Sequence, residues 1–166
     1  LTNLGNAYGD LGDHAKKKEL LERALQIKEA QYGPSHPSVA LTLTNLGTAY
    51  GALGDPATKK ELLERALKIK EAHYGPSHPE VARTLTNLGN AYGALGDRAK
   101  KKELLERALN ILEAHFGPFH SQVAITVFNL GTAALDLGRR DEAKECYSRA
   151  LDIFAAAFGP DHQYTQ

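Results

Sequence analysis

The stretch LTNLG at residues 43–47 decides the fold, because it recurs at a fixed interval along the chain. The same five letters stand at 1–5 and 85–89, and a weaker form, VFNLG, stands at 127–131, so each step is 42 residues. The first two copies of the full period are identical at 34 of 42 positions. Self-similarity at a fixed period is the signature of a repeat protein. The predicted repeats are residues 1–42, 43–84, 85–126 and 127–166.

Each repeat is predicted to contain two helices. In the second repeat, residues 38–53 carry apolar side chains at steps of three and four, which is typical of one buried helical face. Asp55 is the expected N-cap and Pro56 the expected first-turn residue of a second helix that ends near Tyr74. Gly75 suits the position after a helix end. A helix pair of this size cannot bury its apolar face alone, whereas stacked copies can, as in an α-solenoid.

Recurring small and basic residues lead to three predictions about packing. A glycine inside each first helix costs up to about 1 kcal/mol relative to alanine, so a close approach of two helix backbones is predicted there. These glycines are Gly5, Gly47, Gly89 and Gly131, and their expected small partners are Ala24, Ala66, Ala108 and Ala150. In the first three repeats, lysines stand where the fourth repeat has the small residue Ala143. These lysines are expected to extend their charge outward, and a neighbouring alanine is expected to make the close contact. The lysines are Lys17, Lys59 and Lys101, and the alanines are Ala15, Ala57 and Ala99.

The overall composition excludes several classes of partner. Twenty basic residues balance twenty acidic ones, whereas binding to nucleic acid or to an anionic membrane needs a net basic surface. Cys146 is the sole cysteine, so no disulfide forms within the chain, and a cytoplasmic location is expected. No apolar run is long enough to span a membrane, and no leader pattern opens the chain. Because Leu1 lies inside the repeat pattern, we expect a piece of a longer protein.

The repeat resembles the tetratricopeptide repeat at Leu46, Gly47, Tyr50, Ala66 and Leu67. The 42-residue period and the linker GPSHPEVA at residues 75–82 are similar to the long repeats of kinesin light chain and nephrocystin-type proteins. The resemblance covers the whole chain. It implies an all-α fold, a right-handed α-solenoid of helix-turn-helix repeats in a single array over residues 1–166. It also implies a concave groove, lined by the first helices, that binds peptide segments of other proteins.

The candidate site is a set of polar residues on the first helices. One asparagine per repeat stands immediately before a leucine that is expected to be buried, and an amide both donates and accepts hydrogen bonds. Two interpretations stay open: these amides hold the main chain of a peptide, or they bond a neighbouring helix and fix the stacking. The predicted groove residues are Asn3, Asn6, Thr44, Asn45, Thr48, Arg83, Thr86, Asn87, Asn90, Phe128, Asn129 and Thr132. Three glycines, Gly9, Gly51 and Gly93, are expected to leave the groove floor open.

Other patterns have simpler interpretations. Linker histidines at 36, 78, 120 and 162 are too far apart to share a zinc ion, because stacked helices lie about 8–10 Å apart, and a capping or packing role is predicted instead. The lysine runs that begin at Lys16 and Lys100 are interpreted as a solvated convex face. No catalytic arrangement surrounds Cys146, so neither an enzyme nor a cofactor or metal site is expected.

A protein-binding scaffold is therefore the predicted function. The alternatives are a structural spacer that associates end to end, and a regulatory module of a larger multidomain protein.

Overall fold

The computed structural model describes residues 1–158, and the linker region that contains His162 lies outside them. The described residues form eight α-helices and no strand. In chain order they are α1 (Thr2–Asp10), α2 (His14–Tyr32), α3 (Pro37–Ala52), α4 (Pro56–Tyr74), α5 (Pro79–Ala94), α6 (Arg98–Phe116), α7 (Ser121–Asp136) and α8 (Arg140–Phe158). First and second helices alternate along the chain, which confirms the all-α helix-turn-helix prediction. The boundaries between the predicted repeats fall inside α3, α5 and α7.

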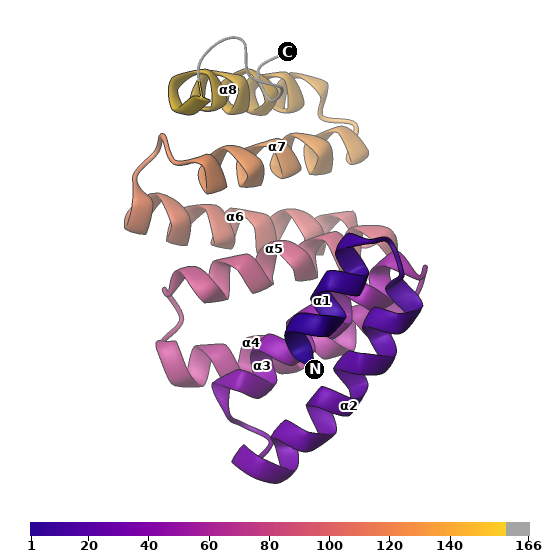
Figure 1. Ribbon diagram of the computed structural model, residues 1–166. Helices are drawn as coiled ribbons and strands as arrows, with labels where there is room; N and C mark the ends of the chain where they lie inside the picture. The colour runs from indigo at the N-terminus through magenta and orange to yellow at the C-terminus, as the bar shows by residue number, and fades with distance from the viewer. Residues whose placement is uncertain (159–166) are drawn as a thin grey trace. The chain divides into compact units, whose positions relative to one another are not determined.

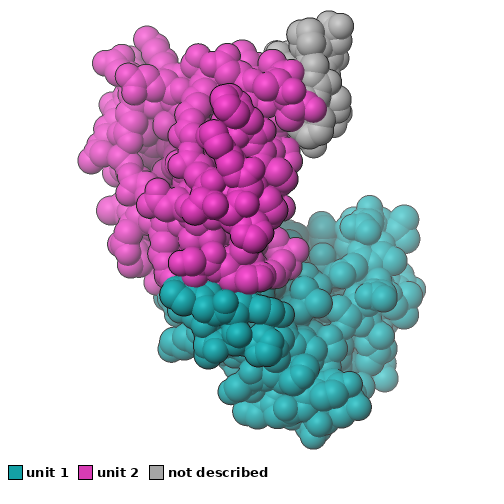
Figure 2. Space-filling view, turned by 90° about the vertical axis from the view of Figure 1, so that its left-hand side faces the viewer, with its two compact units in different colours: residues 1–76 teal, residues 77–166 magenta. Residues whose placement is uncertain are grey.

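The chain divides into two compact units, Leu1–Pro76 with α1 to α4 and Ser77–Gln166 with α5 to α8. Figure 2 gives them different colours. In unit 1, α2 packs against both α1 and α3, and α3 packs against α4. In unit 2, α5 to α8 lie one after another in chain order, each packed against the next (Figure 1). Successive helices are therefore neighbours in space, as expected where short linkers join stacked helix pairs.

Side-chain caps define the helix starts that the sequence indicated. The Asp55 carboxylate accepts a hydrogen bond of 2.9 Å from the Thr58 backbone N–H at the start of α4, and Pro56 is the first helical residue. Asp13 and Asp97 cap α2 and α6 in the same way. Each carboxylate satisfies a backbone donor that the helix leaves free. At the other end of α4, Gly75 has a φ of 86°, a conformation that glycine adopts without a Cβ clash.

Apolar side chains fill the space between the helices of each unit. In unit 1, Val39 and Leu43 of α3 are buried together with Ala66 and Ile69 of α4. In unit 2, Leu105 of α6 is buried with residues of α7 that include Leu130. Each second helix thus buries apolar residues against a first helix. Burial of this kind supplies the main favourable term in folding.

The mid-helix glycines do mark a close approach, but their predicted partners are wrong. A Cβ built on Gly47 would lie 3.3 Å from Leu63 Cγ and 3.4 Å from the Lys59 carbonyl oxygen. Neither neighbour is an alanine of the predicted set. Ala66 is fully buried in the core with Val39 and Leu43 instead. The glycine is therefore needed because a leucine side chain and a helix backbone both press against it.

The lysines of the second helices pack inside the repeats. The Lys59 stem crosses Gly51, where an added Cβ would lie 2.7 Å from Lys59 Cδ. Gly9 and Gly93 make the same room for Lys17 and Lys101, at 2.5 and 2.6 Å. These glycines therefore do not open a groove floor, which corrects that prediction. Burial lowers the pKa of Lys59 because it disfavours the charged form.

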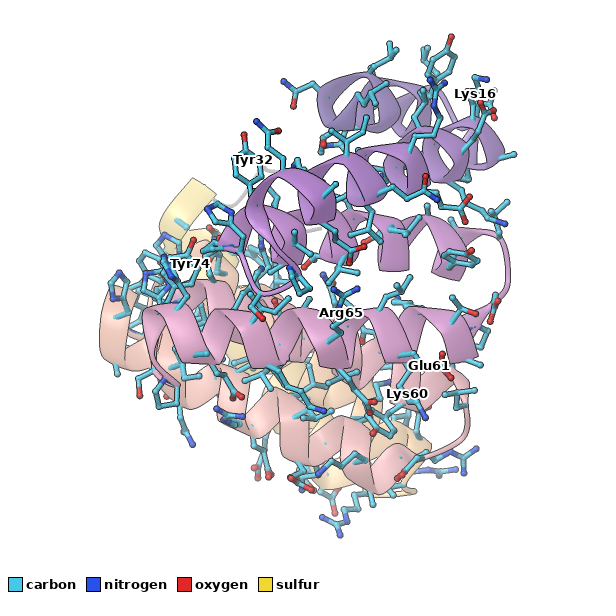
Figure 3. The ribbon with its side chains drawn as sticks, turned by 90° about the horizontal axis from the view of Figure 1, so that it is seen from below. Lys16, Tyr32, Lys60, Glu61, Arg65 and Tyr74 are labelled. Carbon is cyan, nitrogen blue, oxygen red and sulfur yellow. The ribbon has the colours of Figure 1, made fainter. Side chains whose placement is uncertain are left out.

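Two further predictions about these lysines are corrected. Ala15, Ala57 and Ala99 are exposed and take over no close contact. The middle lysine of a run is also not part of a solvated face, since Lys101 is 8% exposed and pairs with Asp136 at 2.9 Å. Lys16 does lie at the surface, where it pairs with a glutamate one turn further on. Figure 3 shows Lys16 and Lys60 at the end of unit 1 opposite Tyr32 and Tyr74.

In the fourth repeat, different residues fill the contact between the first and the second helix. Leu135 stands where the first three repeats have the glycine, and Ala143, 2% exposed, stands where they have the lysine. The exchange of a small and a long side chain across the helix pair conserves the space to be filled. Tyr147 replaces the leucine that faces the mid-helix glycine, and its ring lies 2.8 Å from where a Cβ on Gly131 would stand.

Candidate functional site

The asparagines of the first helices have amide groups without an internal partner. Asn45, Asn87 and Asn129 are half-buried, and Asn3 is exposed. Within residues 1–158, none of these four side chains forms a hydrogen bond. The structure therefore shows no bond from the series to a neighbouring helix, on which the stacking interpretation depends. A half-buried amide that lacks an internal partner keeps its donors and acceptor for a bound molecule or for water.

Hydroxyl groups beside the asparagines are instead used within their own helices. Thr44 is 4% exposed and donates 2.8 Å to the Ala40 carbonyl, and Thr86 donates 3.1 Å to the Ala82 carbonyl. Thr48 and Thr132 bond the carbonyl oxygens of residues 44 and 128 in the same way. Such i−4 bonds occupy the hydroxyl hydrogen. Thr48, Thr86 and Thr132 therefore offer a ligand only their acceptor lone pairs.

A pocket in unit 2 brings three predicted residues together. Arg83, Thr86 and Asn87 of α5 line a cavity of about 260 Å³. Leu112 of α6, which is 3% exposed, also lines it. The opposite wall comes from α7, through Gln122, Ile125 and Thr126. The Arg83 guanidinium donates 2.9 Å to Glu80 one turn away on the same helix. The pocket thus combines an apolar lining with a small number of polar groups, as ligand pockets do.

The remaining predicted residues lie outside this pocket. In unit 1, Asn3 and Thr48 are exposed and Asn6 is half-buried, whereas Thr44 is too buried to contact a ligand. In unit 2, Phe128 is 51% exposed and its ring packs 5.2 Å from that of Tyr147. Tyr147 also donates 3.4 Å to Thr132. Asn90 and Asn129 are half-buried on their helices.

Four pocket residues escaped the sequence analysis: Leu112, Gln122, Ile125 and Thr126. A signal for one of them exists. Leu112 stands where the first two repeats have Lys28 and Lys70, a change of character between repeats that are otherwise alike. The α7 residues carry no such signal, because their part in the pocket depends on how α7 lies against α5 and α6.

Three linker histidines cap helices. His36, His78 and His120 each accept a hydrogen bond through Nδ1 from the backbone N–H two residues on, at 3.1–3.2 Å. The rings of Tyr32 and His36 stack at 4.8 Å. This confirms the capping or packing role predicted for the linker histidines at 36, 78 and 120. Among residues 1–158, no group of three or more metal-ligating side chains lies together.

Cys146 lies half-buried on α8. Burial is the main cause that raises the pKa of its thiol, which favours the unreactive protonated form. None of the described helices is long and apolar enough to cross a membrane.

The family model described as tetratricopeptide repeat matches residues 1–72, 60–114, 102–156 and 122–165. The chain belongs to the tetratricopeptide repeat family. No curated protein matches it. Several solved structures are similar to it.

BtubC (BKLC) from P. vanneervenii has a TM-score of 0.86 and 28% identity over 95% of this chain and 63% of that one. This chain therefore spans less than two thirds of that protein's length. A Podosopora anserina putative kinesin light chain with nearly identical TPR-like repeats has a TM-score of 0.85 and 26% identity, covering 99% and 78%. MamA, at 21% identity and a TM-score of 0.68, shares the fold. The similarity to kinesin-light-chain-like repeats agrees with the family resemblance of the linker and period.

Proposed function

We propose that this protein is a non-enzymatic scaffold that binds extended peptide segments of other proteins along its first helices. Tetratricopeptide repeat proteins generally mediate protein–protein interactions, and this chain belongs to that family. The observation that carries the finer proposal is the series of asparagine amides that lack hydrogen-bond partners within residues 1–158. One such amide per repeat suits a main chain, which offers a donor and an acceptor at each residue.

The chemistry of the surrounding residues supports recognition of a peptide backbone more than of charged side chains. Asn45 has Thr44 and Thr48 beside it, whose hydroxyls are bonded within α3. Among the predicted groove residues, the lone cation is Arg83, and it is paired with Glu80. The formal charge of zero favours protein ligands over nucleic acid or membrane as partners. The proposal also places the protein in the cytoplasm, where a chain with a sole cysteine needs no disulfide.

A peptide-array screen tests the proposal. The wild-type chain is compared with a variant that carries Asn45→Ala and Asn87→Ala, one substitution in each unit. We expect the variant to lose the captured peptides while its helical circular dichroism and melting temperature stay nearly unchanged, since these amides bond nothing internal. The matched control is Asn110→Ala, which removes an exposed asparagine from the second helix α6. Peptides that bind the double variant as well as wild type would contradict the role of the series.

A further inference from the structure

The pocket of unit 2 is lined by a leucine, Leu112, at the position where unit 1 has a lysine. In unit 1, Lys28 of α2 extends to the first turns of α3, where its ammonium lies 2.9 Å from Thr42 Oγ1 and 3.3 Å from the Ser38 carbonyl oxygen. Two repeats further along the chain, the positions of Lys28, Ser38 and Thr42 are occupied by Leu112, Gln122 and Thr126. These three residues all line the pocket. A leucine side chain is shorter than that of lysine, so Leu112 does not reach the counterparts in unit 2 of the acceptors that bond Lys28.

The acceptors that meet Lys28 in unit 1 are preserved in unit 2. Thr126 Oγ1 donates 2.9 Å to the Gln122 carbonyl, just as Thr42 Oγ1 donates 3.0 Å to the Ser38 carbonyl. In unit 1 both oxygen atoms also accept from the Lys28 ammonium, so the Thr–carbonyl bond leaves lone pairs free for a cation. Thr126 is 2% exposed and lines the pocket, so its oxygen is a largely desolvated acceptor there.

We propose that this pocket binds a lysine side chain of a protein ligand, in the place that the chain's own lysine fills in unit 1. The four-carbon stem would lie on Leu112 and Ile125, and the ammonium would bond Thr126 Oγ1 and the Gln122 carbonyl oxygen. The unpaired Asn87 amide on the α5 wall adds a third acceptor. A lysine side chain matches this lining because it combines an apolar stem with a compact donor of three hydrogen bonds.

The charges around the pocket allow a cation. Arg83 is the basic residue of the lining, and its guanidinium is held 2.9 Å from Glu80 on the exposed side of α5. The charges of Arg83 and Glu80 largely cancel at the pocket, and solvent screens the remaining positive field. Unit 1 also shows that burial at this position is compatible with an ammonium group, since Lys28 occupies it even though desolvation lowers its pKa.

The inference rests on the proposed function for its biological use, so its test uses a single side chain instead of a peptide. The probes are N-acetyl-lysine methylamide and N-acetyl-norleucine methylamide, which differ only in the ammonium group. Binding is followed by NMR through the Thr126 and Leu112 methyl signals. We expect the lysine probe to bind about tenfold more tightly, the typical effect of a charge-assisted hydrogen bond. Equal or tighter norleucine binding would show an apolar pocket and overturn the inference.

A substitution at Leu112 tests whether a lysine of the chain itself blocks the pocket. Leu112→Lys restores the residue of the first two repeats, which fold with lysine there, and it should abolish binding of the lysine probe. Leu112→Ala, the matched control, should keep the preference for lysine over norleucine. Unchanged lysine binding in Leu112→Lys, or shifts confined to other residues, would also overturn the inference. Peptide capture that persists in the Asn45→Ala, Asn87→Ala variant, with lysine binding intact, would count against the main-chain proposal alone.

Discussion

At the scale of single residues, neighbouring helices fit by exchange of small and large side chains. Gly51 accommodates the stem of Lys59, and the fourth repeat replaces such a pair with Leu135 and Ala143. The recurrence of each glycine indicated a close contact, but the partner could not be predicted. The partner depends on how far one helix is rotated and shifted relative to the other, and the spacing of residues along one helix carries no such information.

Gly131 provides a test of this tight packing. Gly131→Ala should lower the free energy of unfolding by about 1–3 kcal/mol, the usual cost of overpacking, because the new Cβ would lie 2.8 Å from the Tyr147 ring. In a Tyr147→Leu background, which restores the leucine of the other repeats, the cost should fall. Urea denaturation of the four proteins in this double-mutant cycle measures the coupling. Equal costs in both backgrounds would show that the ring is not the obstacle.

Tyr50 provides a pH-dependent test. Its hydroxyl donates 2.7 Å to Glu22, and this bond is the main cause that raises its pKa to about 12 from an ordinary 10. The folded state holds the proton more tightly, so the contribution is present below pH 10 and is lost as the pH rises from 10 to 12. Tyr50→Phe should cost about 1 kcal/mol at pH 8, because the pair is partly exposed to solvent.

Denaturation at pH 8 and near pH 11.5 checks this expectation. The gap in stability between wild type and Tyr50→Phe should shrink at the higher pH, and a gap that does not depend on pH would contradict it.

At the scale of elements, the sequence indicated the helices well because their ends depend on local chemistry. Asp97 caps α6 by accepting 2.9 Å from the Lys100 backbone N–H, and His120 caps α7. An N-cap, a glycine with positive φ and a proline act within a few residues, so the boundaries near Pro56 and Tyr74 were predictable. The pocket of unit 2 was not, since residues from α5, α6 and α7 line it.

The cap of α6 can be tested by removing its acceptor. Asp97→Ala should lower the free energy of unfolding by about 1 kcal/mol, because the Lys100 backbone N–H loses its partner. Asp97→Asn keeps an oxygen at the same place and should be nearly neutral. Thermal and urea unfolding, followed by circular dichroism, measure both variants. If the asparagine variant lost as much stability as the alanine variant, the negative charge and not the hydrogen bond would be responsible.

At the scale of the whole molecule, a fold shared with the family carries a surface formed by this chain's own residues. The tetratricopeptide repeat identity follows from residues that recur every 42 positions and was predictable from them. The candidate site was predictable in part. The asparagines could be predicted because they recur in every repeat. The pocket of unit 2 lies where the repeats differ, since Leu112 stands at the position of a lysine in the first two repeats. Recurrence reveals what all repeats share, and a site that belongs to one junction appears only in three dimensions.

The most direct test of the central claim is the affinity of one captured peptide for three proteins: wild type, Asn45→Ala with Asn87→Ala, and Asn110→Ala. Fluorescence anisotropy with the labelled peptide measures each dissociation constant. Loss of two hydrogen bonds to the peptide main chain should weaken binding by the double variant about tenfold or more, while Asn110→Ala binds as wild type does. Equal affinity for all three proteins, with the fold intact, would contradict the claim that these asparagines hold a peptide.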